Sequence, residues 1–249
     1  MTGTGKFKDG KTDRICGLIT AIHPRIKTLL VVGCGSGIEA AILAEKLGAA
    51  VTGIDPQDNF DADARRVADL RVGDALALDF PDESFDFVYS YHTLEHIDRP
   101  ALAVREMARV LKPDGGYFIG TPNRSRLVGY LGSHGASFSE KLRWNMNDWR
   151  TRLSGRFRNE LGAHAGFTLA ELRSMLAASL PTPKNQTFAY YRAIYPARPT
   201  TLNVLNATSL YRFAYPCVYF SGKGDETDTA EDHWHSSASA SKKDLHQAS

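Results

Sequence analysis

Two apolar patterns alternate along the first half of the chain. Short, mostly apolar runs are each followed by a segment whose apolar residues lie three and four positions apart. The runs predict β-strands and the segments predict α-helices. Strands are expected at residues 28–33, 50–55, 71–75, 84–92 and 117–123. Helices are expected at residues 13–24, 38–48, 60–70 and 99–112, with Asp98 as the cap of the last. Such alternation is typical of a doubly wound α/β fold with a mostly parallel sheet.

The alternation ends after Asn123. Residues 124–166 are basic and are interpreted as a helical insertion. A further helix is expected after Thr168, which can form a capping box with Glu171. Two late strands are expected at residues 187–196 and 215–224. We therefore expect one domain over residues 13–224, a flexible segment at residues 1–12 and a disordered acidic tail at residues 225–249.

A glycine cluster, "VVGCGSG", follows the first expected strand. Gly33 suits a tight turn, and Gly35 and Gly37 let the backbone approach a ligand without an intervening Cβ. The spacing differs from the dinucleotide-binding G-x-G-x-x-G because the third glycine comes one position early, and no G-K-[ST] follows. The loop favours a ligand with an adenosine but no phosphate. A glycine turn that only packs a helix on a strand is the alternative.

Two aspartates stand where adenosine recognition would need them. Asp55 closes the second strand, where a carboxylate can accept hydrogen bonds from a ribose diol. Asp74 follows the third strand and can accept a hydrogen bond from an adenine amino group. Each could instead be a plain turn aspartate.

Taken in order, "VVGCGSG", "GID" and the segment from "GDALALDF" to "GTPN" resemble the class I S-adenosylmethionine-dependent methyltransferases. The resemblance covers about residues 28–123 and is greatest to the small-molecule branch that includes the ubiquinone-biosynthesis O-methyltransferases. It implies a seven-stranded, mostly parallel Rossmann-like sheet with a late antiparallel hairpin. It also implies S-adenosylmethionine as the cofactor and a small-molecule, sugar or lipid-linked acceptor, with oxygen as the expected methylation site.

The resemblance also assigns the surroundings of the cofactor. The glycine loop would wrap the methionine and ribose, the two aspartates would hold the ribose and the adenine, and the end of the fourth strand would line the methyl-transfer site. The residues so assigned are Gly33, Cys34, Gly35, Gly37, Asp55, Pro56, Asp74, Ala75 and Ser90. One position departs from the family, which usually has an acid two places before the first glycine, where this chain has Val31.

The same comparison supplies catalytic candidates. His92 is the expected general base, because an imidazole titrates near neutrality. His96 and Tyr91 are the second candidates, and a purely structural role is the alternative for either histidine. Some relatives are thought to bind a divalent metal through two glutamates and a histidine of this segment. Here His92 replaces the first glutamate, so no required metal is expected.

Composition adds little to this picture. The chain has 249 residues, 43% apolar and 23% charged, and a formal net charge of +2, which is ordinary for a globular protein. Its three cysteines are odd in number and widely spaced, so neither a disulfide framework nor a zinc site is expected. The N-terminal residues lack the apolar core of a signal peptide, and no apolar run approaches the roughly 20 residues that span a bilayer. A cytoplasmic location is expected.

Three other functions remain open. A non-catalytic, adenosine-binding regulatory domain is favoured by Val31. A nucleic-acid methyltransferase is favoured by the basic insertion, but "SYHT" stands where such enzymes often carry an "NPPY"-type tetrad. An NAD-linked dehydrogenase is disfavoured by the glycine spacing.

The insertion contains one amphipathic pattern. Apolar residues on one expected helix face are Leu142, Met146, Trp149, Leu153 and Phe157, and basic residues largely off that face are Lys141, Arg143, Arg150, Arg152 and Arg156. Such a helix could pack its stripe on the domain, form a lid whose arginines hold an acidic acceptor, or lie on an anionic membrane surface.

Overall fold

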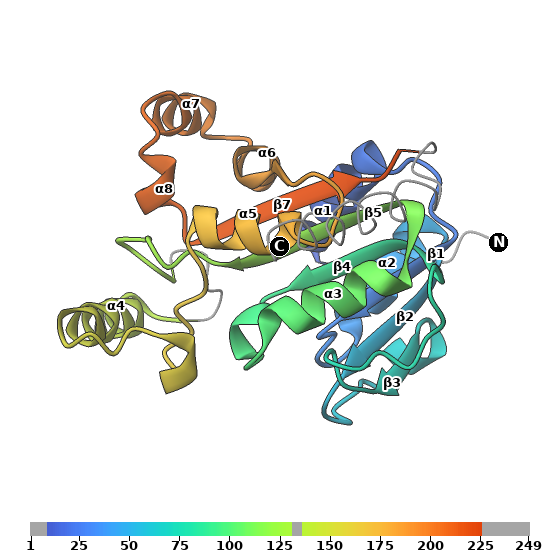
Figure 1. Cartoon of the computed structure of the whole chain (residues 1–249). Coiled ribbons are helices and arrows are strands. Elements are labelled where there is room, and N and C mark those ends of the chain that lie inside the picture. The colour runs from blue at the N-terminus through green and yellow to red at the C-terminus, as the bar shows by residue number, and fades with distance from the viewer. Residues whose placement is uncertain (1–8, 131–135, 226–249) are drawn as a thin grey trace, which may run out of the picture.

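The structure is a computed structural model that describes residues 9–130 and 136–225 (Figure 1). A seven-stranded sheet with the order β3-β2-β1-β4-β5-β7-β6 forms its centre. The strands are β1 Thr28–Val32, β2 Ala50–Asp55, β3 Asp69–Val72, β4 Phe85–Tyr91, β5 Leu111–Pro122, β6 Lys184–Asn185 and β7 Cys217–Lys223. The first five are parallel, and β7 runs antiparallel to both β5 and β6. This confirms the expected doubly wound, mostly parallel sheet with antiparallel pairing at its late edge.

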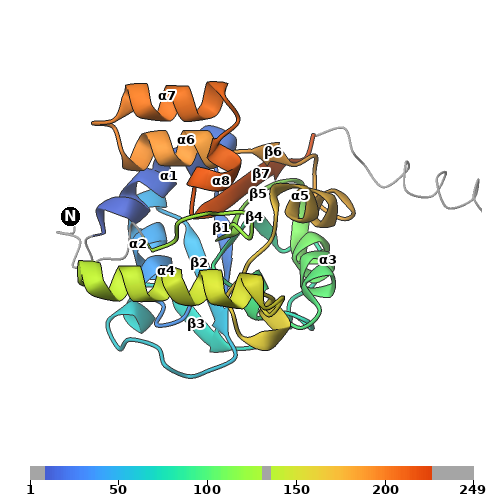
Figure 2. The same ribbon diagram turned by 90° about the vertical axis from the view of Figure 1, so that its left-hand side faces the viewer.

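Helices cover both faces of the sheet. The helices are α1 Gly10–Ile22, α2 Ile38–Leu47, α3 Pro100–Val110, α4 Phe138–Leu153, α5 Leu169–Ala177, α6 Thr187–Ile194, α7 Pro199–Ala207 and α8 Tyr211–Ala214. Three short 3₁₀ segments are Ala64–Arg66, Leu94–His96 and Asn159–Leu161. One core lies between the sheet and α1, α2 and α6, and the other lies between the sheet and α3 and α5 (Figures 1 and 2).

Alternating side chains of the strands fill the two cores. Along β1, Leu29 and Val31 enter the first core, while Leu30 and Val32 enter the second. A parallel strand covered on both sides therefore reads as a continuous apolar run, which explains why β1 was visible in the sequence. In this register Val31 pairs with Tyr89 of β4.

The helix expected at residues 60–70 is wrong. Asp61 accepts hydrogen bonds from the backbone amides of Asp63 and Ala64 and so forms a local turn that leads only into the 3₁₀ segment. The chain then enters β3, where Leu70 is buried against Gly37. Side-chain-to-backbone hydrogen bonds of this kind compete with helix formation.

The late strand expected at residues 187–196 is also wrong. Asn185 ends the two-residue β6 and accepts a hydrogen bond from the Thr187 amide, at which point α6 begins. The helix buries Tyr190 against Tyr219 of β7, with ring centroids 3.7 Å apart. Tertiary packing of aromatic rings thus overrides their preference for strands.

The sequence predicted some helix ends correctly and others wrongly. The Thr168–Glu171 capping box opens α5 as expected. Asp98 does not cap α3, which has Arg99 at its N-cap and Pro100 in its first turn. Helix α1 begins at Gly10, inside the segment expected to be flexible, because Asp9 caps it. The expected acidic tail lies outside the described residues from residue 226 onward.

The insertion forms the expected helix, but its stripe does not pack on the domain. Phe157 is buried, whereas Leu142, Met146, Trp149 and Leu153 are exposed. Within the described part of the chain, no helix is long and apolar enough to cross a membrane.

Candidate active site

The glycine loop joins β1 to α2 at the carboxyl ends of the parallel strands. Gly33, Gly35 and Gly37 all have positive φ, which favours glycine. A Cβ at Gly33 would lie 2.1 Å from the Thr93 hydroxyl, so this position is glycine because of packing. A Cβ at Gly35 would meet nothing within 4 Å, so open space lies beside its backbone. The loop therefore combines two tightly packed glycines with one exposed backbone segment that a ligand can approach.

Cys34 contributes only backbone to this loop. Its side chain is buried, and a Cβ on Gly53 of β2 would lie 2.9 Å from its sulfur. Burial raises the pKa of the Cys34 thiol to about 12. The thiol is therefore a packing group.

Asp55 binds the glycine loop directly. One carboxylate oxygen accepts a hydrogen bond of 2.9 Å from the Gly35 amide, and the other accepts one of 3.1 Å from the Gln57 amide. A carboxylate offers about four acceptor positions, so lone pairs remain for a ribose diol. Asp55 thus holds the loop and can still accept hydrogen bonds from a ligand.

The other residues assigned to the adenosine lie at the same edge of the sheet. Asp74 is exposed in the turn after β3 and accepts a hydrogen bond of 2.8 Å from the Leu76 amide. Pro56 is exposed beside Asp55, and Ala75 is half-buried beside Asp74.

His92 lies directly after β4 and is held from both ring nitrogens. Its Nδ1 is 3.2 Å from a carboxylate oxygen of Glu95, and its Nε2 is 3.3 Å from the sulfur of Cys217. The backbone of His92 has φ +54°, a conformation that is costly for a residue other than glycine. Strained residues cluster at functional sites, and this one places an imidazole between two polar groups.

The environment of His92 makes it more basic than an ordinary histidine. Burial by itself lowers its pKa, but the hydrogen bonds to Cys217 and Glu95 outweigh burial and raise the pKa to about 9. Glu95 is 4% exposed, and its second carboxylate oxygen has no hydrogen-bond partner in the described chain. The imidazole side chain is 37% exposed, so it remains within reach of a ligand.

Of the other expected site residues, Tyr91 and the cofactor-binding candidate Ser90 lie near His92, and the catalytic candidate His96 faces another hollow. The Tyr91 ring lies 4.2 Å from the His92 ring and contacts the Lys11 ammonium, which sits 3.6 Å above its centroid. Ser90 is buried, and its hydroxyl donates to the Val32 carbonyl, so it braces β1 against β4. His96 is half exposed and packs edge-on against His164 in a hollow of about 250 Å³ that His92 does not line.

Known proteins resemble this chain in sequence. The family described as "Methyltransferase domain" matches residues 30–119. A phosphatidylethanolamine N-methyltransferase of Cereibacter sphaeroides is 30% identical over 201 residues, which cover 75% of this chain and 90% of that protein. The chain belongs to the class I S-adenosylmethionine-dependent methyltransferases.

Other relatives match a shorter part of this chain. A ubiquinone biosynthesis O-methyltransferase of Pseudomonas entomophila is 33% identical over 129 residues, 47% of this chain and 53% of that protein. A 2-methyl-6-phytyl-1,4-hydroquinone methyltransferase of Synechocystis is 43% identical over 94 residues, 35% of this chain and 30% of that protein. The chain thus spans about a third to a half of the length of these curated relatives.

One solved structure illustrates the shared fold. Phosphoethanolamine N-methyltransferase 2 of Haemonchus contortus, in complex with S-adenosyl-L-methionine, superposes with a TM-score of 0.54. The two are 18% identical, and the match covers 85% of this chain and 52% of that one. At this identity the likeness concerns the fold alone.

An acid lies near the glycine loop although Val31 stands at the position where the family usually has one. Val31 is 2% exposed and lies in the core, where it pairs with Tyr89. The Tyr89 hydroxyl donates a hydrogen bond of 2.9 Å to Glu39, in the first turn of α2. Burial raises the pKa of Glu39, while the Lys11 ammonium and the Tyr89 hydroxyl oppose that shift. Glu39 thus provides a carboxylate at the end of the glycine loop.

The residues present fit S-adenosylmethionine. Its methionine portion carries an ammonium and a carboxylate, and Glu39 and Lys11 place a carboxyl and an amino group beside the loop. Burial raises the pKa of Glu39 and lowers the pKa of Lys11, and the attraction between the two groups opposes both shifts. Gly35 leaves open space, and Asp55 has spare acceptor positions for the ribose. For metals, no group of three or more His, Cys, Asp or Glu side chains in the described ranges is arranged to hold an ion.

Sequence reasoning missed Glu39, Lys11 and Cys217 as site residues. Glu39 carried a signal, since it is an acid two positions after the last loop glycine in a chain that lacks the usual acid. Lys11 lies in a polar segment without a pattern. Cys217 is 125 residues from His92, and only the pairing of β7 with β5 brings it there.

Proposed function

We propose that this protein transfers the methyl group of S-adenosylmethionine to a hydroxyl oxygen of a small-molecule, sugar or lipid-linked acceptor. The observation that carries the proposal is His92, held by Glu95 and Cys217 at the end of β4. A hydroxyl is a weak nucleophile until it loses its proton, so an oxygen acceptor needs a base at this place. The names of the quinone-pathway relatives support an acceptor of this kind.

The bound cofactor would supply an electrophilic methyl group on a sulfonium. The glycine loop and Asp55 would hold its ribose, Asp74 and Ala75 would flank its adenine, and Glu39 and Lys11 would bind its charged methionine end. These contacts would fix the position of the methyl group relative to the acceptor, and proximity accounts for much of the rate enhancement of such a transfer.

His92 would act as the base through Nε2. Glu95 binds Nδ1 and so orients the ring and stabilises the imidazolium that forms. The sulfur of Cys217 occupies the Nε2 side in this structure, and an acceptor hydroxyl would take that place. Tyr91 lies against the ring and limits its rotation. Glu95 and Tyr91 are therefore positioning residues, and His92 is the catalytic residue of the proposal.

An amine acceptor is the second candidate. The Lys11 ammonium lies on the Tyr91 face at 3.6 Å, so this ring can hold a cation, and an acceptor ammonium would have to displace Lys11 from it. The phosphatidylethanolamine N-methyltransferase relative supports this candidate by its name and its coverage. An amine that is already neutral needs no base, so the two acceptors differ in their dependence on His92.

The test is a pair of measurements on the purified protein. Calorimetry should show binding of S-adenosylhomocysteine at micromolar concentrations, about −8 kcal/mol, and no binding of NAD. A screen of hydroxyl and amine acceptors with radiolabelled S-adenosylmethionine then identifies the acceptor class. Binding without turnover on any acceptor would favour a regulatory domain, and binding of NAD alone would exclude the proposal.

The three free cysteines support a reducing cytoplasm as the site of the reaction.

A further inference from the structure

Helix α4 turns an apolar face to the solvent. Its large apolar side chains lie at steps of four, four, three and four, on one side of the helix. Their exposed fractions are 83% for Phe138, 51% for Leu142, 58% for Met146, 43% for Trp149 and 86% for Leu153. None of them is among the buried residues of either core. We call these five residues the apolar stripe.

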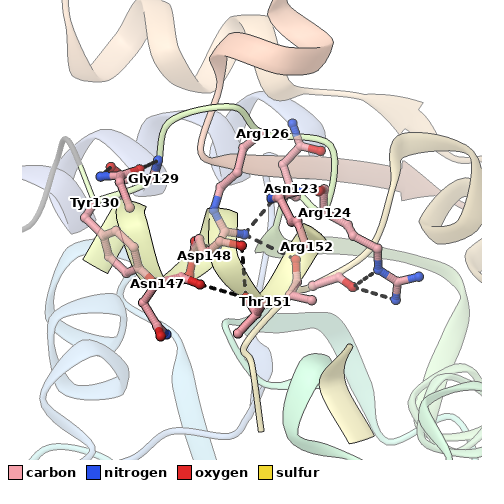
Figure 3. Close-up of polar contacts among 12 residues, drawn as sticks. Asn123, Arg124, Arg126, Gly129, Tyr130, Asn147, Asp148, Thr151 and Arg152 are labelled. Atoms are coloured by element: carbon pink, nitrogen blue, oxygen red, sulfur yellow. Dashed lines mark hydrogen bonds and ion pairs between the residues drawn. The ribbon is translucent and has the colours of Figure 1, made fainter. Parts of the chain in front are cut away.

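The face of α4 that contacts the domain carries mainly polar groups, together with Trp144, whose ring lies 5.2 Å from the Tyr130 ring. Asp148 accepts hydrogen bonds from Arg126 and from the Tyr130 hydroxyl, and Arg152 donates to the Arg124 carbonyl at 2.7 Å (Figure 3). Asn145 exchanges two hydrogen bonds with the backbone of Gly129. The usual arrangement of an amphipathic helix is thus inverted, since polar groups attach α4 and apolar groups face outward. Because buried hydrogen bonds fix the orientation of α4, the exposure of the apolar stripe is a defined feature of the fold.

Positive charges lie next to the stripe. Lys141, Arg143 and Arg150 form no ion pair within residues 9–130 and 136–225. Arg143 and Arg150 share a shallow hollow of about 310 Å³ with Leu142 and Met146. Arg152, in contrast, is attached to the domain and lies 3.9 Å from the Phe157 ring, so it is not available to an acceptor as a lid arginine would be.

Exposed apolar residues also occur outside α4. Figure 2 shows α4, α7 and α8 on one side of the molecule, near the ends of β4 and β5. Further exposed apolar residues of these elements and their loops are Leu127, Val128, Leu161, Val204, Leu210 and Phe213. Large exposed apolar patches often mark interaction sites, and the apolar stripe of α4 is the part of this surface whose residues share one helix face.

We propose that this side docks the protein on the surface of an anionic phospholipid bilayer, with the apolar stripe inserted between headgroups and Lys141, Arg143 and Arg150 against lipid phosphates. Large aliphatic side chains, a tryptophan and flanking cations on one helix are the composition that binds such interfaces. A second copy of this chain fits less well, because Arg143 and Arg150 of both copies would face each other. The helix has 16 residues and lies across the molecule, so it rests on the bilayer without spanning it.

The position of α4 gives the docking a consequence. Arg126 and Asn123 follow β5 directly and connect α4 to the carboxyl end of the sheet, where His92 lies. Docking would therefore bring the methyl-transfer site to the bilayer surface, where an acceptor with an apolar tail resides. The docking itself does not depend on the proposed reaction and can be measured without it.

The test is co-sedimentation of the full chain with vesicles of phosphatidylcholine alone or with 30% phosphatidylglycerol, about equal in size and lipid concentration. We expect at least about tenfold stronger binding to the anionic vesicles, reduced by 0.5 M salt because exposed charges are screened. The variant L142S/M146S/W149S should lose at least about tenfold of this binding, and R143E/R150E should lose the preference for anionic lipid. The five side chains replaced in these two variants are exposed, so the midpoint of thermal unfolding should be unchanged in both.

Matched controls are V72S on exposed β3 and R105E on exposed α3, which should bind vesicles as the unaltered protein does. Equal binding to neutral and anionic vesicles, or unaltered binding of the stripe variant, would overturn the proposal. A dimer in light scattering that the stripe variant converts to a monomer would also overturn the proposal, because a second copy of the chain would then cover the apolar stripe. Deletion of residues 226–249 should leave vesicle binding within twofold; a larger increase would mean that this acidic segment is the occupant. Cofactor binding is measured on the same variants, so a loss of docking and a failure of the proposed reaction remain distinguishable.

Discussion

The Arg126 guanidinium donates a hydrogen bond of 2.9 Å to the carboxylate of Asp148, and both side chains are almost fully buried (Figure 3). This pair connects the loop after β5 to the middle of α4. The Nη1 of Arg126 also donates to the carbonyls of Asn123 and Ala165, so three hydrogen bonds fix the guanidinium in this place. A charge pair buried in this way orients the helix and thereby decides which of its faces meets the solvent.

Breaking this pair should loosen the insertion. Asp148→Ala leaves the Arg126 cation buried without its partner, a change that costs roughly 3–5 kcal/mol in comparable sites. We expect a lower midpoint in chemical unfolding and faster hydrogen exchange of the α4 amides. The double variant R126M/D148L should recover much of the loss, and R150A on the exposed side of the same helix is the control. Wild-type exchange rates in Asp148→Ala would show that the pair does not hold α4.

His92 should control turnover and its pH dependence. With its pKa raised to about 9, the imidazole is protonated at neutral pH and becomes a base only as the pH rises through that value. On a hydroxyl acceptor we expect kcat/KM to increase up to about pH 9 and then level off. Glu95→Gln removes one cause of the raised pKa, so the profile should shift to lower pH while its plateau falls.

Truncation of the same residue separates the two acceptor classes. His92→Ala should lower kcat on a hydroxyl acceptor by about 10²–10⁴-fold, with the Kd for S-adenosylhomocysteine nearly unchanged. A loss below about fivefold on the hydroxyl acceptor would assign His92 a structural role. On an amine acceptor the loss should be small at a pH where the amine is neutral.

Asp55 should matter for cofactor binding in two ways. Its carboxylate holds the Gly35 amide and is the expected acceptor for the ribose hydroxyls. Hydrogen bonds to a charged acceptor contribute roughly 1.5–3 kcal/mol each, so Asp55→Ala should raise the Kd for S-adenosylhomocysteine at least about tenfold. Asp79→Ala, an exposed aspartate outside the loop, is the control in calorimetry. An unchanged Kd would place the ribose elsewhere.

Glu39 should replace the acid that the family has at the position of Val31. Glu39→Gln keeps the shape and the Tyr89 contact but removes the charge that would pair with the cofactor ammonium. We expect the Kd for S-adenosylhomocysteine to rise about tenfold, in line with a charge-assisted hydrogen bond. The Kd for adenosine, which has no ammonium, should stay the same. Glu45→Gln, on the exposed side of α2, is the matched control, and an equal effect on both ligands would contradict this role.

Local patterns along the chain predicted the parallel part of the sheet and the glycine loop. Strands β1, β2 and β4 are buried on both faces, so their apolar runs are visible without a structure. The loop glycines and Asp55 lie within one strand–helix–strand unit, where chain connectivity alone brings them together. The capping box at Thr168 is likewise local, and it was found for the same reason.

Features that depend on contacts between distant segments could not be predicted from local patterns. The aromatic residues around Tyr190 favour a strand, yet the segment is a helix in which Tyr190 stacks on Tyr219. Cys217 reaches His92 because β7 runs antiparallel beside β5, a pairing that no local pattern specifies. The periodicity of α4 showed an apolar stripe but not its direction, because that direction follows from the buried contact between Arg126 and Asp148. A pattern along the chain reports which residues share a face, and only the packing of other segments determines what that face meets.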